Sequence, residues 1–216
     1  MKTLRILLAD DHTVVRQGLR KVIEEQPEWQ VVAEAADGRE AVRLAGEHKP
    51  DIAILDVAMP LLNGVETTRQ IVRHFPKVRV LVLSMYADEA YVAQVLHAGA
   101  AGYILKDSAD TDLFQAISAV AEGKSFFSPA VARLMLDDYV RQRTEPGVVD
   151  RFESLSERER EVFQLIAEGK VNKEIGALLS ISTSTVETHR ARIMEKLDVH
   201  SAVEIVLYAV RRGVVR

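Results

Sequence analysis

Acidic side chains directly follow short apolar runs in this sequence. The run LRILLA ends at Ala9 and is followed by Asp10 and Asp11, and the run IAIL is followed by Asp56. A carboxylate at the end of an apolar strand is costly unless water, a cation or a partner side chain meets it. We therefore expect Asp56 either at an exposed strand end or in a functional cleft.

Two further polar groups end apolar runs, Ser84 after VRVLVL and Lys106 after GYIL. If these runs are parallel strands, their carboxyl ends share one edge of a sheet and the polar groups converge there. Converging carboxylates need a cation, and oxygen ligands favour a hard ion such as Mg²⁺. An aspartate beside Mg²⁺, a lysine and a hydroxyl has the parts for accepting a phosphoryl group. Each residue alone fits a turn, a cap or a solvated charge, but their coincidence at successive strand ends favours the functional interpretation.

Alternating periodicities predict the elements that would position these groups. Apolar runs predict strands at 4–9, 30–35, 51–55, 78–84 and 102–105. Amphipathic patterns predict helices at 13–26, 38–47, 64–73, 88–98 and 109–123. Strands that are apolar throughout and alternate with helices predict a parallel sheet covered on both faces.

The pattern changes after Pro129. Residues 129–143 predict one more helix, and TEPGVVD at 144–150 predicts a linker, because it contains proline, glycine and charge without a period. Every later element is predicted to be helical. Ser156 and Glu159 have the spacing of a helix capping box, and Gly169 is placed to end that helix.

The composition limits the class of protein. The 216 residues are 48% hydrophobic and 28% charged, which is typical of a soluble globular chain. The absence of cysteine excludes a disulfide framework and a thiolate nucleophile or metal site. The apolar runs are too short for a membrane span, and the stretch MKTLRILLADD lacks the features of a signal peptide. We therefore expect a cytoplasmic protein.

Residues 3–124 resemble a response-regulator receiver domain, through LADDH, LDVAMPLLNG, VLVLSMYAD and AAGYILKD in that order. The resemblance implies a flavodoxin-like (βα)5 fold in which Asp56 accepts a phosphoryl group from a sensor histidine kinase. It also implies roles for the neighbouring residues: Mg²⁺ held by Asp10, Asp11, Asp56 and the backbone carbonyl of Ala58, charge neutralisation by Lys106, and a switch pair formed by Ser84 and Tyr103.

Two alternatives concern the Asp56 chemistry. A haloacid-dehalogenase-type phosphatase also uses an aspartate after an apolar strand, but it needs a second aspartate two residues later, where this chain has Ala58. A receiver that only docks, without phosphorylation, would have no need of the complete acidic cluster. Ala58 leaves the dephosphorylation rate of the receiver open.

The segment from Lys173 to Leu197 predicts a helix-turn-helix unit, with helices at 173–179 and 183–197 joined by a tight turn. On the second helix, Val186, His189, Ile193 and Leu197 form an inward stripe, while Ser184, Glu187, Thr188, Ala191, Arg192 and Glu195 point outward. We predict base contacts from Glu187, Thr188 and Ala191, further DNA contact from Ser184, and phosphate contacts from Lys173, Arg190, Arg192 and Lys196. Charge alone would equally fit a small helical bundle with a solvated basic face.

The tail closely resembles the four-helix LuxR/NarL-type DNA-binding domain, through LSEREREV, AEGKVNKEI and STVETHRARIMEKL. It departs from the family at Gly176, where alanine is usual. The resemblance implies a dimer surface on the last helix, at about 201–212, formed by Ala202, Ile205, Val206 and Ala209. The alternative for these four residues is packing within the domain.

Together the two resemblances indicate a NarL/FixJ-type response regulator. They divide the chain into a receiver domain at 1–124, an interdomain helix and linker at 125–152, and a helix-turn-helix domain at 153–216. The function implied is a phosphorylation-regulated transcription regulator rather than an enzyme. Its implied partners are a sensor histidine kinase, double-stranded promoter DNA and, after phosphorylation or on DNA, a second copy of the chain, with no membrane partner.

Overall fold

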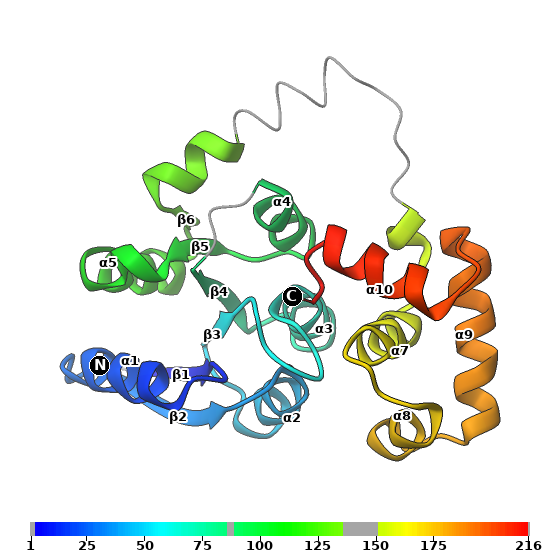
Figure 1. Cartoon of the computed structure of the whole chain (residues 1–216). Coiled ribbons are helices and arrows are strands. Elements are labelled where there is room, and N and C mark those ends of the chain that lie inside the picture. The colour runs from blue at the N-terminus through cyan, green and yellow to red at the C-terminus, as the bar shows by residue number, and fades with distance from the viewer. Residues whose placement is uncertain (1–2, 86–88, 136–150, 216) are drawn as a thin grey trace. The chain divides into compact units, whose positions relative to one another are not determined.

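The computed structural model describes residues 3–85, 89–135 and 151–215. The chain divides into two compact units, residues 1–145 and 146–216, which are drawn together in Figure 1 and considered separately below. Within the described residues, no helix combines the length and the apolar character that crossing a membrane requires.

The first unit is a parallel sheet with helices on both faces. Its strands are β1 (Leu4–Ala9), β2 (Trp29–Ala35), β3 (Ile52–Asp56), β4 (Arg79–Ser84), β5 (Gly102–Leu105) and β6 (Phe126–Phe127). Its helices are α1 (Thr13–Glu24), α2 (Gly38–His48), α3 (Gly64–His74), α4 (Glu89–His97) and α5 (Ala109–Ala121), with a 3₁₀ turn at Lys106–Ser108. The strands are hydrogen-bonded in the order β2-β1-β3-β4-β5-β6, and every pair is parallel. This confirms the predicted flavodoxin-like sheet.

Alternate residues of each central strand enter two separate cores, as expected for strands covered on both faces. Leu7 of β1 and Leu55 of β3 pack with residues from α2, α3 and α4. Ile6 and Ile54, one position away, pack with residues from α1 and α5 on the opposite face. The helices therefore form two layers around the sheet (Figure 1). Consequently, the sheet exposes its strand ends rather than its faces to a ligand.

The sequence did not predict strand β6. Phe126 and Phe127 pair with Gly102 and Tyr103 of β5, and two residues are too short to show a period. The helix predicted at 129–143 is described over residues 129–135, where Val131 is completely buried in the core formed with α2, α3 and α4. The remainder of that helix and the predicted linker at 144–150 lie outside the described residues.

The second unit is helical throughout its described residues. It contains a 3₁₀ turn at Arg151–Ser154 and helices α7 (Glu157–Ala167), α8 (Asn172–Leu179), α9 (Thr183–Leu197) and α10 (Ala202–Arg211). Its interior centres on Phe163, whose ring meets those of Phe152 and Tyr208 edge-on at centroid distances of 5.2 and 6.0 Å. The predicted capping box of Ser156 and Glu159 is present at the start of α7.

The turn between α8 and α9 is tight, and Gly176 lies directly against it. The N–H of Ile181 donates to the carbonyl of Gly176 at 2.9 Å, which folds the turn back onto α8. A Cβ atom at position 176 would lie 2.8 Å from the oxygen of Ile181. Ser180 adopts a left-handed conformation (φ 54°), and Ser182 then caps α9 by accepting from the N–H of Thr185. Gly176 therefore has a steric function in the helix-turn-helix unit.

Candidate functional site

The carboxyl ends of four strands bring the predicted polar groups to one edge of the sheet. Asp10 follows β1, Asp56 ends β3, Ser84 ends β4 and Lys106 follows β5. The ammonium of Lys106 lies 2.6 Å from Oδ2 of Asp10 and 3.1 Å from Oδ2 of Asp56. Asp10 and Asp56 are only 1% and 4% exposed. The structure thus assembles a buried cation between two buried carboxylates, from residues far apart in the sequence.

A sharp turn after β3 keeps the side chain of Asp56 at this edge. The N–H of Gly64 donates to the carbonyl of Val57 at 2.8 Å. A Cβ atom on Gly64 would lie 2.1 Å from the backbone oxygen of Asp56, so only glycine permits this approach. Asn63 begins α3 by accepting from the N–H of Glu66 at 2.9 Å. Ala58 lies in this turn, partly buried.

The surroundings of Asp56 and Lys106 shift their proton affinities. Burial raises the pKa of Asp56, the negative charge of Asp10 raises it further, and the nearby Lys106 only partly opposes this shift. Burial alone would lower the pKa of Lys106, but its hydrogen bond to Asp10 and the charges of Asp56 and Asp10 outweigh burial and raise the pKa. Lys106 is therefore held in its charged form against the two carboxylates.

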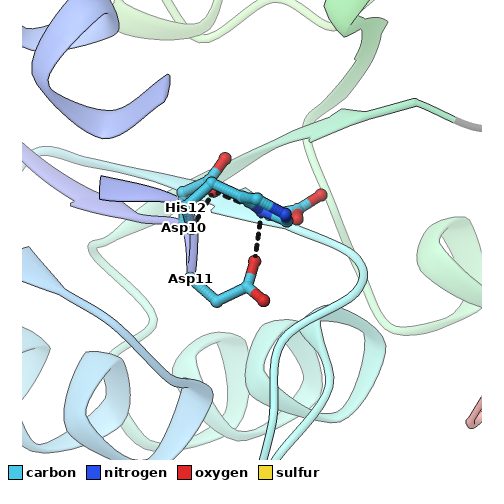
Figure 2. Close-up of side chains that lie close together, drawn as sticks. Asp10, Asp11 and His12 are labelled. Atoms are coloured by element: carbon cyan, nitrogen blue, oxygen red, sulfur yellow. Dashed lines mark hydrogen bonds and ion pairs between the residues drawn. The ribbon is translucent and has the colours of Figure 1, made fainter. Parts of the chain in front are cut away.

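Asp11 and His12 complete the acidic cluster on its solvent side. His12 donates its backbone N–H to Oδ1 of Asp10 at 2.8 Å, and its Nδ1 lies 2.7 Å from Oδ1 of Asp11 (Figure 2). One ligand atom from each of Asp10, Asp11, His12 and Asp56 can be chosen so that all four lie within 4.8 Å of one another. No role was predicted for His12, although its place directly after two carboxylates was a usable signal.

The donor set of this cluster fits a small divalent cation. Mg²⁺ binds oxygen ligands at about 2.1 Å, so ligands on opposite sides of the ion lie roughly 4.2 Å apart. The three carboxylates offer oxygen atoms that all lie within 4.8 Å of one another, so small movements would bring them around one ion. They also carry more negative charge than Lys106 alone can balance.

Ser84 and Tyr103, the predicted switch pair, lie on the neighbouring strands β4 and β5. Both residues are completely buried. In the register of these strands, Ser84 lies opposite Leu105, and Tyr103 lies opposite Val82. Tyr103 belongs to the core that packs against α2, α3 and α4, so its ring is a core side chain in this conformation.

In the second unit, α9 presents the predicted outward face to solvent. Val186, Ile193 and Leu197 are buried, whereas His189 at the same stripe is partly exposed. The exposed residues of the helix include Ser184, Glu187, Thr188, Ala191 and Arg192. The predicted inward and outward faces of this helix are therefore confirmed.

The predicted cationic residues have different surroundings. Lys173 is exposed near the start of α8, and Arg190 is partly buried and donates to Oδ1 of Asn172 at 2.9 Å. Lys196 is exposed but already has partners within the unit, because its ammonium lies 2.6 Å from Oε2 of the buried Glu159 and donates to the carbonyl of Ser154 at 3.0 Å. A helical wheel of α9 alone could not show that the start of α7 lies beside Lys196. The structure therefore favours an intradomain role for this lysine.

The predicted dimer surface on α10 requires correction. Ile205 and Ala209 are completely buried, because this face of α10 packs inside the unit, and they are inaccessible to a partner. Ala202 is exposed and Val206 is partly exposed. The apolar residues that α10 exposes most are Val203, Leu207 and Val210. The period of the sequence identified the apolar face of α10 correctly. However, Ile205 and Ala209 on this face pack within the unit and do not form a dimer surface.

Two known families match the two units. The family described as "Response regulator receiver domain" matches residues 6–118, and "Bacterial regulatory proteins, luxR family" matches residues 153–209. The parallel sheet, its acidic edge and the helix-turn-helix unit are those of a receiver followed by a DNA-binding domain. The chain belongs to the response-regulator family, in its NarL/FixJ-type branch with a LuxR-type domain.

Full-length relatives have the same organisation. "Oxygen regulatory protein NreC" of Staphylococcus haemolyticus (strain JCSC1435) is 41% identical over 212 residues, which cover 97% of this chain and 98% of that protein. "Transcriptional regulatory protein DegU" of Brevibacillus brevis is 36% identical over 225 residues, covering 99% and 95%. The solved "two-component response regulator RcsB-DNA complex" has a TM-score of 0.60 at 30% identity, covering 97% of this chain and 98% of that one.

This family membership defines the function at the level of the whole chain. The protein is a phosphorylation-regulated transcription regulator, with a receiver domain and a LuxR-type DNA-binding domain. A response regulator of this kind is a transcription factor, and its receiver implies a histidine kinase as partner.

Proposed function

We propose that Asp56 is the phosphoacceptor of this receiver. A carboxylate oxygen of Asp56 attacks the phosphorus of a phosphohistidine on the sensor kinase, the phosphorus–nitrogen bond breaks, and an acyl phosphate forms on Asp56. The observation that supports this most is the position of Lys106, whose ammonium lies 3.1 Å from Asp56 and 2.6 Å from Asp10. A fixed positive charge there stabilises the negative charge on the transferring oxygens.

Three side chains and one carbonyl group would hold Mg²⁺: Asp10, Asp11, Asp56 and the backbone carbonyl of Ala58. The bound ion would supply positive charge to the phosphoryl oxygens. Lys106 aligns Asp56, and its bond to Asp10 keeps that carboxylate at the same edge. Ala58 presents no polar side chain to the phosphoryl group, so the lifetime of the acyl phosphate depends on other groups.

The proposed response to phosphorylation begins at Ser84. Its hydroxyl moves toward the new phosphoryl group and donates to it, and Tyr103 turns into the vacated space. Both residues are fully buried on adjacent strands, so a movement of one requires its neighbours to repack. That repacking would alter the surface of α4 and β5 and thereby change domain docking, dimerisation or both.

The proposed DNA-binding surface is the exposed face of α9 together with the start of α8. Glu187, Thr188 and Ala191 would contact bases, and Ser184 would add a contact near the helix start. Lys173, Arg190 and Arg192 would contact phosphates. The exposed apolar residues of α10 would meet a second copy of the chain, and a two-fold dimer would bind an inverted repeat of promoter DNA.

We propose domain limits of 1–124 for the receiver, 125–152 for the interdomain helix and linker, and 153–216 for the DNA-binding domain. The family matches at 6–118 and 153–209 support these limits. Pairing of Phe126–Phe127 with β5 extends the packing of the first unit into the interdomain segment. A regulator of promoters acts where the chromosome lies, which supports a cytoplasmic location.

The test is the mass of the intact protein after incubation with acetyl phosphate, with and without Mg²⁺. We expect one added phosphoryl group that requires Mg²⁺ and is absent from Asp56→Asn. The matched control is Asp51→Asn, which alters a carboxylate at the opposite end of the same strand and leaves an oxygen to accept from the N–H of Arg5. The control should be labelled like the wild type.

The same samples should then be compared by size and by promoter binding at equal salt. Larger size and tighter binding after labelling are expected. If the protein gains no mass but still binds promoter DNA, the receiver is a phosphorylation-independent docking module. Repeated turnover of a phosphate ester would instead favour an aspartate-nucleophile phosphatase.

A further inference from the structure

His12 is part of the acidic cluster, and neither the fold nor the transfer chemistry proposed above requires it. Its Nδ1 lies 2.7 Å from Oδ1 of Asp11 and 3.4 Å from Oδ1 of Asp10. Its side chain is 59% exposed, so burial does not force the ring into this position. Figure 2 shows the ring beside the carboxylates of Asp10 and Asp11, with a dashed line that joins it to Asp11. The position of the ring therefore needs an explanation.

The backbone around His12 fixes the position from which the imidazole reaches the cluster. Its N–H donates to Oδ1 of Asp10, and the side chain of Arg16 donates to the carbonyl of Asp10 at 2.6 Å. His12 stands at the N-cap position of α1, but its side chain makes no capping hydrogen bond. The imidazole therefore does not cap α1, and replacing it removes no capping hydrogen bond.

We propose that His12 is a nitrogen ligand of the divalent cation in this receiver. The inference rests on the proposed function, because it concerns the same cation site. Nδ1 of His12 would coordinate together with the carboxylates of Asp11 and Asp56, while Nε2 carries the ring proton. The ligand atoms of these residues already lie within 4.8 Å of one another, so small side-chain movements suffice to bring them around one ion.

A nitrogen donor changes which metals the site prefers. Mg²⁺ favours oxygen ligands and gains little from an imidazole. Mn²⁺ and the later first-row metals bind imidazole readily, with affinities that rise along the series toward copper. With His12 as a ligand, the site should therefore prefer Mn²⁺ over Mg²⁺ more strongly than a site built from carboxylates alone.

The direct test is electron spin echo spectroscopy of the full chain with one equivalent of Mn²⁺ in frozen solution. Modulation from a directly coordinated ¹⁴N nucleus is expected in the wild type and should disappear in His12→Ala. The variant retains the backbone N–H that bonds to Asp10, so the loop keeps its anchor. The matched control is His200→Ala, an exposed histidine in the other unit, which should leave the modulation unchanged.

Binding affinities give the second measurement. Titration calorimetry of the wild type and His12→Ala should show Mn²⁺ affinity falling on the order of tenfold while Mg²⁺ affinity changes much less. Bound Mn²⁺ without nitrogen modulation, or an unchanged ratio of Mn²⁺ to Mg²⁺ affinity in His12→Ala, would overturn the proposal. If such a protein still gains a Mg²⁺-dependent phosphoryl group on Asp56, the proposed function stands and only the role of His12 fails. Absence of both metal binding and labelling would overturn both.

Discussion

The two units assemble their functional groups in opposite ways. The receiver collects Asp10, Asp56 and Lys106 from three strand ends and buries them almost completely. The DNA-binding unit places its proposed base contacts, Glu187, Thr188 and Ala191, along one helix and exposes them. The receiver site is thus a product of tertiary structure, whereas the DNA-binding surface follows from the period of a single helix.

This difference has energetic consequences. Buried charges at close range depend on one another, so removing one leaves the others with an uncompensated desolvation cost. Exposed side chains on a helix are each surrounded by water and act more independently. Substitutions in the receiver site should therefore affect stability and function together, while those at the proposed base contacts of α9 should change DNA binding alone.

The largest effect is expected from Lys106→Met, which removes the ammonium group that contacts both Asp10 and Asp56. We expect a loss of about 3 kcal/mol in the free energy of unfolding of the first unit, because two buried carboxylates lose their partner. Urea unfolding followed by tryptophan fluorescence measures it, since the single tryptophan, Trp29, lies in the first unit. Lys124→Met, which removes an exposed ion pair with Glu122, is the control and should leave the same free energy nearly unchanged. Equal stability of Lys106→Met and the wild type would refute the coupling of the buried charges.

Two glycine substitutions in the first unit distinguish the effect of a steric clash from the effect of helix propensity. Gly64→Ala should destabilise it by about 3 kcal/mol, because the new Cβ would overlap the backbone oxygen of Asp56. Gly18→Ala in α1 should stabilise it by about 0.5–1 kcal/mol, since nothing lies within 4 Å of the new Cβ. Trp29 fluorescence in urea reports both changes. Similar shifts in the two variants would mean that the turn after β3 is less tightly packed than its geometry indicates.

In the second unit, the roles of base and phosphate contacts can be separated. Glu187→Ala should cost about 1–3 kcal/mol on the preferred promoter sequence and relax the preference at one base pair. Lys173→Ala should weaken binding to all sequences alike and reduce the salt slope by about one. Fluorescence anisotropy with a preferred and a scrambled duplex at several salt concentrations distinguishes them. Both variants should unfold like the wild type, and a loss of stability in either would place that residue in the fold instead.

The comparison also explains which features the sequence could predict. Strands β1 to β5 and helices α1 to α5 were predicted to within a few residues, because each has a clear period. Asp10, Asp56 and Lys106 were found because parallel strands bring their ends to one edge. Strand β6 has two residues, which is too short for a period. The sequence did not explain why position 176 is a glycine. The reason is steric, because a Cβ atom there would lie too close to the backbone oxygen of Ile181 in the following turn.

The dimer-surface prediction for Ile205 and Ala209 was wrong, and the partners of Lys196 and the position of His12 were missed, for related reasons. Lys196 and Ile205 were assigned from the faces of isolated helices, but α7 packs beside the first and the interior of the unit encloses the second. His12 was passed over because its neighbours Asp10 and Asp11 already accounted for the motif. Periodicity tells which residues share a face of a helix, but only packing tells whether that face meets solvent.

The smallest expected effect tests whether Lys196 acts within the fold or on DNA. Burial would raise the pKa of Glu159, but the bonds from Lys196 and Ser156 outweigh it and lower the pKa below its usual range. A carboxyl group whose pKa is lower in the folded state contributes stability above its unfolded pKa, and that stability is lost as the pH falls through the folded pKa. Lys196→Met should therefore cost up to about 1 kcal/mol at neutral pH, and wild type and variant should converge in acid.

Urea unfolding followed by circular dichroism measures this change, with the transition of the first unit identified from Trp29 fluorescence. Lys173→Met is the matched comparison, because it removes an exposed lysine from the same unit. We expect Lys173→Met to weaken DNA binding at unchanged stability, and Lys196→Met to lower stability at nearly unchanged DNA affinity. If Lys196→Met instead weakened DNA binding as much as Lys173→Met without a change in stability, Lys196 would be a phosphate contact after all. Its bond to Glu159 would then have to break when the protein binds DNA. A residue of α9 would in that case be coupled to a buried carboxylate, and the proposed contrast between a coupled receiver site and independent DNA contacts would not hold for this helix.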